Sequence, residues 1–213
     1  MGPRVESLMR GVVKRVLAGV GAQPRWVPRR LLTVVSADLD ADEGVGAVWV
    51  VWRPKSARAR KHMVLLEWYE EGWRSVGGGS GPMDDPGEPD VMEICGGSGV
   101  LSLTRRQDPP RSIATAPWIA CVAIHVGQDV DRVLVGNRRL DAPPHRKLIA
   151  AWKCPQIARR VRPVIVALAE DGTELSRMGP HDGLDTHTWA RLREELEPGR
   201  TEGKPRPPNG ETA

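Results

Sequence analysis

The stretch VSADLDADEGVGAVWVVW (Val35–Trp52) places an acidic segment that ends in glycine between two apolar runs. Before the acidic residues, Leu31, Val35 and Leu39 fall on one face of an extended chain. Residues 45–52 are apolar almost throughout and rich in Val and Trp, which favours a strand. Asp and Gly between two such runs are typical of a turn, because Asp hydrogen-bonds its own backbone and Gly tolerates positive φ. The stretch therefore predicts an antiparallel hairpin.

The aspartates that alternate over Asp38, Asp40 and Asp42 also suggest a calcium loop, a hypothesis that the spacing does not support. Such a loop needs a glycine at its sixth position and a bidentate glutamate at its twelfth. Counted from the first aspartate, the twelfth position is Trp49, and counted from the second it is Val51. Neither register closes a cage of oxygen ligands, so we expect a turn and no metal.

Short apolar runs separated by turn residues continue to Met178. Tight turns are expected at Glu70–Gly72, Gly136–Asn137 and Asp171–Gly172. Two glycine-rich segments, residues 77–90 and Gly96–Gly99, are expected to be loops, the first of them long and mobile. Roughly ten short strands joined in this way predict a mainly β fold, an antiparallel β-sandwich over residues 26–180.

An amphipathic helix is expected before the sandwich, within residues 1–22. Residues 4–20 carry Val, Leu and Met at helical spacing, with Arg and Lys on the other side. Its apolar side needs support from its own sheet, another subunit or an anionic membrane surface. Strands such as residues 118–126 are apolar on both faces, which favours a covered sheet with the helix as the cover.

A second, shorter helix is expected within residues 181–199. Asp185, Thr186 or Thr188 is the predicted N-cap, and Trp189, Leu192 and Leu196 form the apolar side. The group His181, Asp182, Asp185 and His187 has no familiar zinc spacing, so we interpret it as a polar, capped helix start. Residues 200–213 have the composition of a disordered tail.

One loop stands out by its charge. The segment RPKSARARKH (residues 53–62) forms a hairpin tip if the strands on either side pair. Its cations are the candidate anion- or partner-binding residues: Arg53, Lys55, Arg58, Arg60 and Lys61. Arginine can clamp a phosphate or carboxylate through two hydrogen bonds, although a solvated tip without a ligand is the competing interpretation.

Other features exclude several function classes. Cys95, Cys121 and Cys154 lie too far apart for a CxxC metal or redox pair. No phosphate-loop or nucleophile-elbow motif occurs, and neither a convincing signal peptide nor an apolar run long enough to span a membrane is present. The net charge of +4 is modest. We expect a cytoplasmic protein without a cofactor.

These observations favour a non-enzymatic β-sandwich module that binds or regulates a protein partner. The first alternative is a binder of anionic surfaces, nucleic acid or membrane, through the basic helix and the basic loop. The second alternative is an enzyme without a recognisable motif. The sequence leaves the oligomeric state open.

Overall fold

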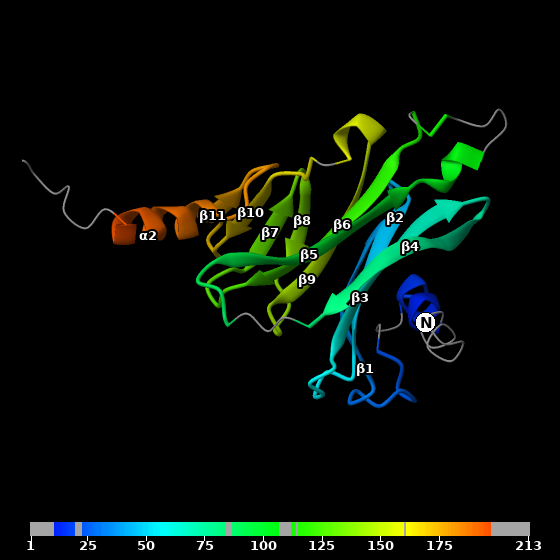
Figure 1. Cartoon of the computed structure of the whole chain (residues 1–213), viewed down its shortest axis with the longest axis horizontal. Coiled ribbons are helices and arrows are strands. Elements are labelled where there is room, and N and C mark those ends of the chain that lie inside the picture. The colour runs from blue at the N-terminus through cyan, green and yellow to red at the C-terminus, as the bar shows by residue number, and fades with distance from the viewer. Residues whose placement is uncertain are drawn as a thin grey trace, which may run out of the picture.

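The computed structural model of the chain describes residues 11–19, 23–83, 87–106, 112–113, 115–159 and 161–196. Within these ranges the fold is mainly β, as predicted, with eleven antiparallel strands and two helices (Figure 1). The strands are β1 (Leu32–Asp40), β2 (Val45–Trp52), β3 (Arg60–Tyr69), β4 (Gly72–Pro82), β5 (Met92–Leu101), β6 (Trp118–Val126), β7 (Arg132–Val135), β8 (Arg138–Asp141), β9 (Lys147–Cys154), β10 (Ile165–Leu168) and β11 (Glu174–Met178). The helices are residues 11–17 and α2 (Thr186–Leu196), and the short 3-10 turns are η1 (Leu103–Arg106) and η2 (Gln156–Ala158).

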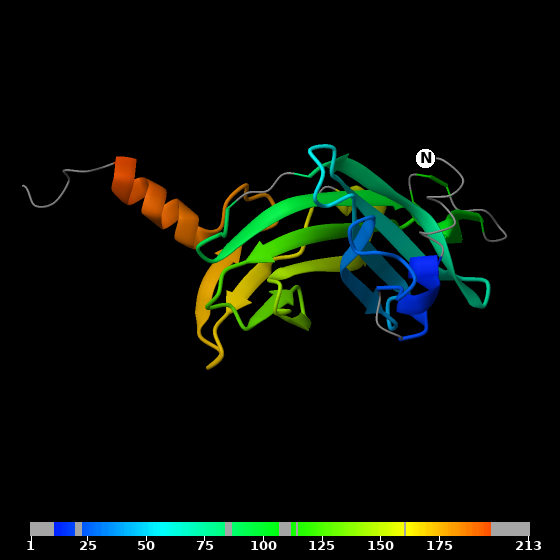
Figure 2. The same cartoon turned by 90° about the horizontal axis from the view of Figure 1, so that it is seen from below.

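The strands form three sheets, which we call the N-terminal, central and C-terminal sheets. Their strand orders are β1-β2-β3-β4, β5-β6-β9 and β11-β10-β7-β8. The central sheet packs on the N-terminal sheet through one face and on the C-terminal sheet through the other. The long central strands run from the N-terminal sheet at one end of the molecule to the C-terminal sheet at the other (Figure 2).

Strand β6 shows why several runs of the sequence lack alternation. Cys121 and Ala123 belong to the core shared with the N-terminal sheet, whereas Val122 and Ile124 belong to the core shared with the C-terminal sheet. Both faces are buried, so apolar side chains are needed at successive positions. The sequence predicted such a cover but assigned it to the N-terminal helix. For β6 the cover is instead the C-terminal sheet, which local sequence cannot reveal.

The N-terminal helix covers the outer face of the N-terminal sheet. Val12 is fully buried there, and Lys14 on the opposite side of the helix is exposed. The apolar cluster between helix and sheet includes Val12, Val13, Val16 and Leu17 from the helix and Val48, Val50 and Leu66 from the sheet. Of the three predicted supports, the helix's own sheet is therefore confirmed for residues 11–17. The rest of the predicted helix, residues 4–10 and 20, lies outside the described residues.

The predicted hairpin turn is confirmed, but two of its aspartates are buried. Strands β1 and β2 pair from Leu32 opposite Trp52 to Asp40 opposite Val45. Asp38 and Asp40 are 7% and 8% exposed. The Arg138 guanidinium lies 2.6 Å from Asp38 Oδ1 and 3.1 Å from Asp40 Oδ2. These carboxylates are thus ion-pair partners of an arginine.

Side chains also join the N-terminal sheet to the central sheet where β1 meets β9. The backbone N–H of Ala151 donates to Asp38 Oδ2 (2.8 Å), and that of Ile149 donates to Ser36 Oγ (3.1 Å). Arg138 donates to the Ala151 carbonyl oxygen (2.8 Å). Polar side chains therefore occupy hydrogen-bonding positions on β9 that a neighbouring strand would otherwise fill.

The prediction of a loop is wrong for the first part of one glycine-rich segment and for the whole of the other, whereas residues 83 and 87–90 lie outside the strands as predicted. Residues 77–82 lie in β4, and Gly96–Gly99 lie in the middle of β5. A Cβ at Gly78 would stand 1.9 Å from the Met63 carbonyl oxygen, and one at Gly99 would stand 2.3 Å from the Trp118 indole nitrogen. Glycine is present because neighbouring chain and side chains approach too closely for a Cβ, which is its other role within strands.

Candidate partner-binding site

The predicted basic residues do not form one site. Trp52 pairs with Arg60 across β2 and β3, so residues 53–59 form the hairpin tip as predicted. The side chains of Arg53, Lys55, Arg58 and Arg60 are exposed, and the Arg53 guanidinium lies 6.0 Å from the centre of the Trp52 ring. Lys61 is directed differently, because alternation in β3 places it on the same face as the buried Met63. Its Nζ donates to the Cys95 carbonyl oxygen at 2.6 Å.

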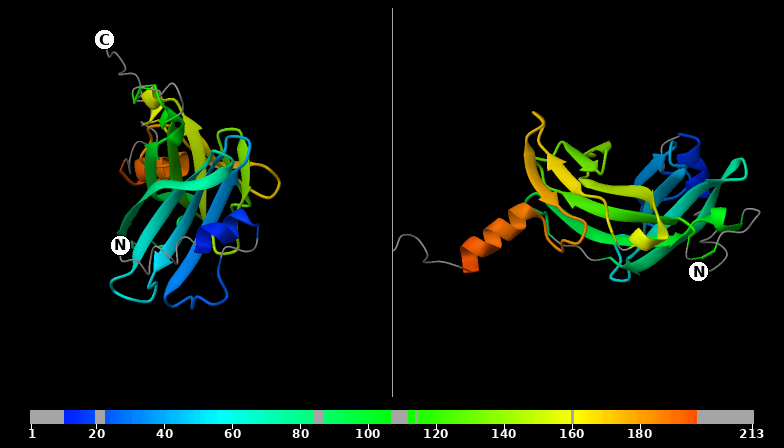
Figure 3. Two further views of the ribbon diagram at one scale, coloured as in Figure 1. Left: turned by 90° about the vertical axis from the view of Figure 1, so that its right-hand side faces the viewer. Right: turned by 90° about the horizontal axis from the view of Figure 1, so that it is seen from above.

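Among the described residues, helix α2 carries an apolar side that the sheets leave uncovered. It extends away from the three sheets (Figure 3). None of its eleven residues is buried, although Trp189, Leu192 and Leu196 recur at the spacing of one helix face. Trp189 is 50% exposed and Leu196 is 78% exposed. The apolar stripe that the sequence predicted is present, but within the described residues the sandwich does not bury it.

The start of α2 is fixed by its cap. Asp185 is 1% exposed, and its Oδ1 accepts hydrogen bonds from the backbone N–H groups of His187 (3.0 Å) and Thr188 (3.2 Å). Its Oδ2 accepts from Thr188 Oγ1 (2.7 Å), and the Ser176 hydroxyl of β11 also donates to the carboxylate. Burial raises the pKa of Asp185, but the hydrogen bonds outweigh it and hold the pKa below its ordinary value. Of the three predicted N-caps, Asp185 is therefore the one observed.

Further contacts hold the base of the helix against the body of the protein. Arg162 donates to the carbonyl oxygens of Gly179 (2.8 Å) and Asp182 (2.6 Å) in the segment that leads to α2. Arg191, in the second turn of the helix, forms an ion pair with Asp90. These bonds join the base of the helix to Asp90, just before β5, and to Arg162, just before β10.

A groove of about 340 Å³ lies beside this base. Its apolar walls come from Met92, Ile94, Met178 and Leu184, and Leu184 is itself 37% exposed. Thr188 and Arg191 of the helix line this groove, whereas Trp189, Leu192 and Leu196 do not, so the groove lies beside the helix base and apart from its apolar side.

The polar group that the sequence singled out at residues 181–187 has the predicted structural role. His181 and His187 are exposed. The carboxylates of Asp182 and Asp185 accept hydrogen bonds from backbone N–H groups. Among the described residues no three potential metal-ligating side chains cluster together. The helix-start interpretation is confirmed for Asp185, whereas Asp182 stabilises the turn at Gly179 that precedes the helix.

Another buried carboxylate, Glu67, was not found from the sequence. It is fully buried, and its Oε1 accepts from Ser102 Oγ (2.5 Å) and Lys153 Nζ (3.1 Å). Its Oε2 accepts from the Leu103 backbone N–H (2.6 Å). Both oxygens are engaged and closed off from solvent, so Glu67 fastens η1 to β3 and β9.

Comparison with known proteins assigns no family. The tRNA 5-methylaminomethyl-2-thiouridine biosynthesis bifunctional protein MnmC of Burkholderia ambifaria is 38% identical over 66 residues. These residues are 30% of this chain and 10% of that protein, so the chain spans about a tenth of the curated relative that it matches. No protein family matches the sequence, and no solved structure matches it significantly. In the part of the chain that the structure describes, no helix is both long and apolar enough to cross a bilayer.

Proposed function

We propose that this protein is a non-enzymatic β-sandwich module that binds a partner protein through α2. One observation carries the proposal: a helix whose start is fixed by a buried cap has an apolar side that no other described residue covers. An isolated helix of this length is marginal in water, and its stability in proteins comes chiefly from burying an apolar face. A partner that covers Trp189 and Leu196 supplies this burial.

The partner expected at α2 is a different protein with an apolar groove. A Trp side chain buries at most about 250 Å². Three apolar side chains that are already partly covered offer well under the roughly 800 Å² that each side of a standard interface buries. Two copies that meet through flat helix faces would therefore bury too little surface for a stable dimer. A groove on a different protein would also cover the flanks of the helix. Arg191, Arg193, Glu194 and Glu195 give the helix no net charge, which disfavours an anionic membrane as the occupant.

The test uses the intact chain and the variant Trp189→Ala/Leu196→Ala. Alanine keeps the helix propensity and neither residue is buried, so the variant should fold. A protein captured from an extract of the native host should bind the wild type and the control Arg53→Gln/Arg58→Gln, but not the α2 variant. With purified partner, Trp189→Ala should weaken binding by at least about 30-fold in calorimetry, the scale of an aromatic hot spot.

Two outcomes would contradict this proposal. Equal affinity of the partner for wild type and the α2 variant would remove α2 from the interface. A wild-type dimer in light scattering that becomes a monomer in Trp189→Ala would make a second copy the occupant.

A second candidate function is binding to an anionic surface through the exposed tip residues Arg53, Lys55, Arg58 and Arg60. Four solvent-exposed cations within one hairpin favour it, and MnmC, the protein with the partial match, is by its name a tRNA biosynthesis protein. The packing of Val12 against the sheet counts against the version in which the N-terminal helix enters a membrane. Binding of tRNA that falls steeply with salt and is lost in Arg53→Gln/Arg58→Gln would support it, and binding unaffected by that variant would contradict it.

A further inference from the structure

The segment PRWVPRRL (Pro24–Leu31) leads into β1 and repeats one four-residue pattern. Each half begins with a proline, continues with an arginine and ends with an apolar residue. The Val27 N–H donates to the Pro24 carbonyl oxygen (3.1 Å), and the Leu31 N–H donates to the Pro28 carbonyl oxygen (2.8 Å). Hydrogen bonds from residue i+3 to residue i are those of two successive β-turns. We call this segment the double turn.

The ends of the two turns are held inward, so their middle residues project into solvent. Pro24 is buried, and Val27 belongs to the apolar cluster on the outer face of the N-terminal sheet. Gln23 fixes the double turn to β1, because its Nε2 donates to the carbonyl oxygens of Val27 and Leu32 (3.2 Å each). Its Oε1 accepts from the Val34 N–H (2.9 Å). The four middle residues are all exposed: Arg25, Trp26, Arg29 and Arg30.

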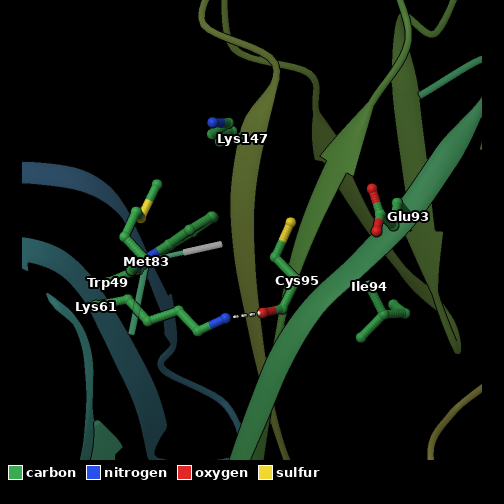
Figure 4. A pocket seen from close by; sticks show the side chains of 7 residues that line it. All are labelled: Trp49, Lys61, Met83, Glu93, Ile94, Cys95 and Lys147. Carbon is green, nitrogen blue, oxygen red and sulfur yellow. Dashed lines mark hydrogen bonds between the residues drawn. The ribbon is translucent and has the colours of Figure 1, made fainter. Parts of the chain in front are cut away.

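The double turn lies beside the basic tip between β2 and β3, at one end of the N-terminal sheet (Figure 1, Figure 3). The Arg53 N–H donates to the Leu31 carbonyl oxygen (2.9 Å), which joins the two segments. Lys61 of the same charged run is directed away from this end, because its Nζ donates to the Cys95 carbonyl oxygen of the central sheet (Figure 4). The tip contributes three exposed cations beside the double turn: Arg53, Lys55 and Arg58.

The three arginines of the double turn and these three tip residues form a surface with six cations, which we call the basic end. The segments that build it, residues 23–37 and 53–66, contain neither Asp nor Glu. Among the described residues, none of the six cations forms an ion pair. Like charges placed this close together are tolerated in solvent or opposite an anion. Arginine binds a phosphate through two hydrogen bonds, so a chain of phosphates complements this surface.

Trp26 adds an aromatic ring to the basic end. Its side chain is 66% exposed. A Cβ at Gly11 would stand 3.5 Å from Trp26 Cζ2, so one edge of the ring lies near the start of the N-terminal helix. The ring is therefore supported on one side and open to solvent on the other. A nucleobase can stack on such a ring whatever its sequence, because every base has a π face.

The apolar content of the basic end favours a nucleic acid over a membrane. A membrane-surface site buries a face of several apolar side chains among the lipid headgroups. Within residues 23–37 and 53–66, Trp26 is the one exposed large apolar side chain. One ring is enough to stack a base, but it offers little apolar area for a bilayer. A base within a duplex is already stacked on both sides, so the ring suits a single strand.

We propose that the basic end binds single-stranded nucleic acid. The six cations contact successive phosphates of the backbone, and one base stacks on Trp26. This proposal rests on the second candidate function, because it uses the same tip cations. It adds the double turn and the stacked base, and it does not involve α2.

Fluorescence anisotropy tests the stacked base with labelled single strands of about 12 nucleotides, as RNA and as DNA, and with a duplex of the same sequence. Trp26→Ala should weaken single-strand binding at least about fivefold, the lower end of the effect of base–aromatic stacking, and leave duplex binding unchanged. Trp26→Phe should restore most of the affinity. Trp189→Ala removes a half-exposed Trp from α2 and should have no effect. The tighter of the two single strands, RNA or DNA, identifies the ligand, and either supports the proposal.

The salt dependence of binding separates phosphate contacts from stacking. Arg29→Gln/Arg30→Gln should reduce the slope of log K against log salt concentration by about 1.4, at about 0.7 for each phosphate contact on a single strand. Trp26→Ala should leave this slope unchanged. The matched control is Arg139→Gln/Arg193→Gln, which removes two exposed arginines from β8 and α2 and should change neither affinity nor slope.

Three outcomes would overturn the proposal. Single-strand binding that is lost in Arg53→Gln/Arg58→Gln but unaffected by Trp26→Ala and Arg29→Gln/Arg30→Gln would exclude the double turn and leave the second candidate function standing. An equal loss of single-strand and duplex affinity in Trp26→Ala would exclude the stacked base. Binding to phosphatidylserine vesicles without binding to any oligonucleotide would make an anionic membrane the ligand.

Discussion

The docking of the N-terminal helix can be tested through Val12, which is fully buried between that helix and the N-terminal sheet. Val12→Ala removes two carbon atoms from this core, worth about 1.6 kcal/mol of transfer free energy at about 0.8 kcal/mol each. The cavity left behind raises the loss to about 2–3 kcal/mol, and the better helix propensity of alanine returns up to about 0.7 kcal/mol. The net expected loss is about 1.5–2.5 kcal/mol, a fall in melting temperature of roughly 4–8 °C.

The assay is urea unfolding followed by circular dichroism, with Lys14→Ala as the control on the exposed side of the same helix. Lys14→Ala should change the free energy of unfolding by less than about 0.5 kcal/mol. Val12→Asp should lower the free energy of unfolding further than Val12→Ala, because the helix then detaches rather than bury a carboxylate. The dye ANS should then bind the exposed sheet face around Val48 and Leu66. A Val12→Ala variant as stable as wild type would refute the packing argument.

Three further predictions concern the strands and the α2 cap. Gly78→Ala should lower the free energy of unfolding in urea by more than about 2 kcal/mol, because its Cβ would stand 1.9 Å from the Met63 carbonyl oxygen. Gly81→Ala is the control: its Cβ meets only the end of a lysine side chain at 3.6 Å, so the loss should stay under about 1 kcal/mol. Arg138→Met leaves two buried aspartates without their cation. Calorimetry should show a loss of about 3–5 kcal/mol in the free energy of unfolding. A loss below about 1 kcal/mol would contradict a stabilising role for these ion pairs. Because its folded-state pKa is lowered, Asp185 contributes stability that is present above its unfolded pKa near 3.8 and is lost as pH falls through the lower folded value. The stability gap between wild type and Asp185→Asn should therefore be widest near pH 7 and close at acidic pH, and a gap independent of pH would argue against a charged cap.

Features encoded by neighbouring residues could be predicted from the sequence. The hairpins at Gly136–Asn137 and Asp171–Gly172 form as expected, because these dipeptides favour the turn whatever the rest of the chain does. The Asp185 cap was one of three candidates, because a short acidic side chain there precedes an amphipathic helix. In residues 11–17 the helical spacing likewise indicated which residues would pack on the sheet.

Features that depend on distant contacts could not be predicted. The partner of Asp38, Arg138, lies a hundred positions away, so the aspartates resembled an ordinary exposed turn. The glycines of β4 and β5 resembled loops, because the close approach that requires them involves other strands. Lys61 belongs to the same charged run as the tip cations, and only strand alternation separates it from them. The uncovered side of α2 has the pattern of a helix that packs on its own domain.

The hydrogen bonds that join side chains of β1 to the backbone of β9 have a consequence for self-association. An outer strand with unpaired backbone groups is a template on which another chain can add and begin amyloid growth. On β9 the N–H groups of Ile149 and Ala151 are bonded to Ser36 and Asp38, and the Ala151 carbonyl is bonded to Arg138. An incoming strand would have to displace all three side chains and place its own carbonyl groups beside a buried carboxylate. These hydrogen bonds therefore join two sheets and also hinder fibril formation on the apolar strand β9.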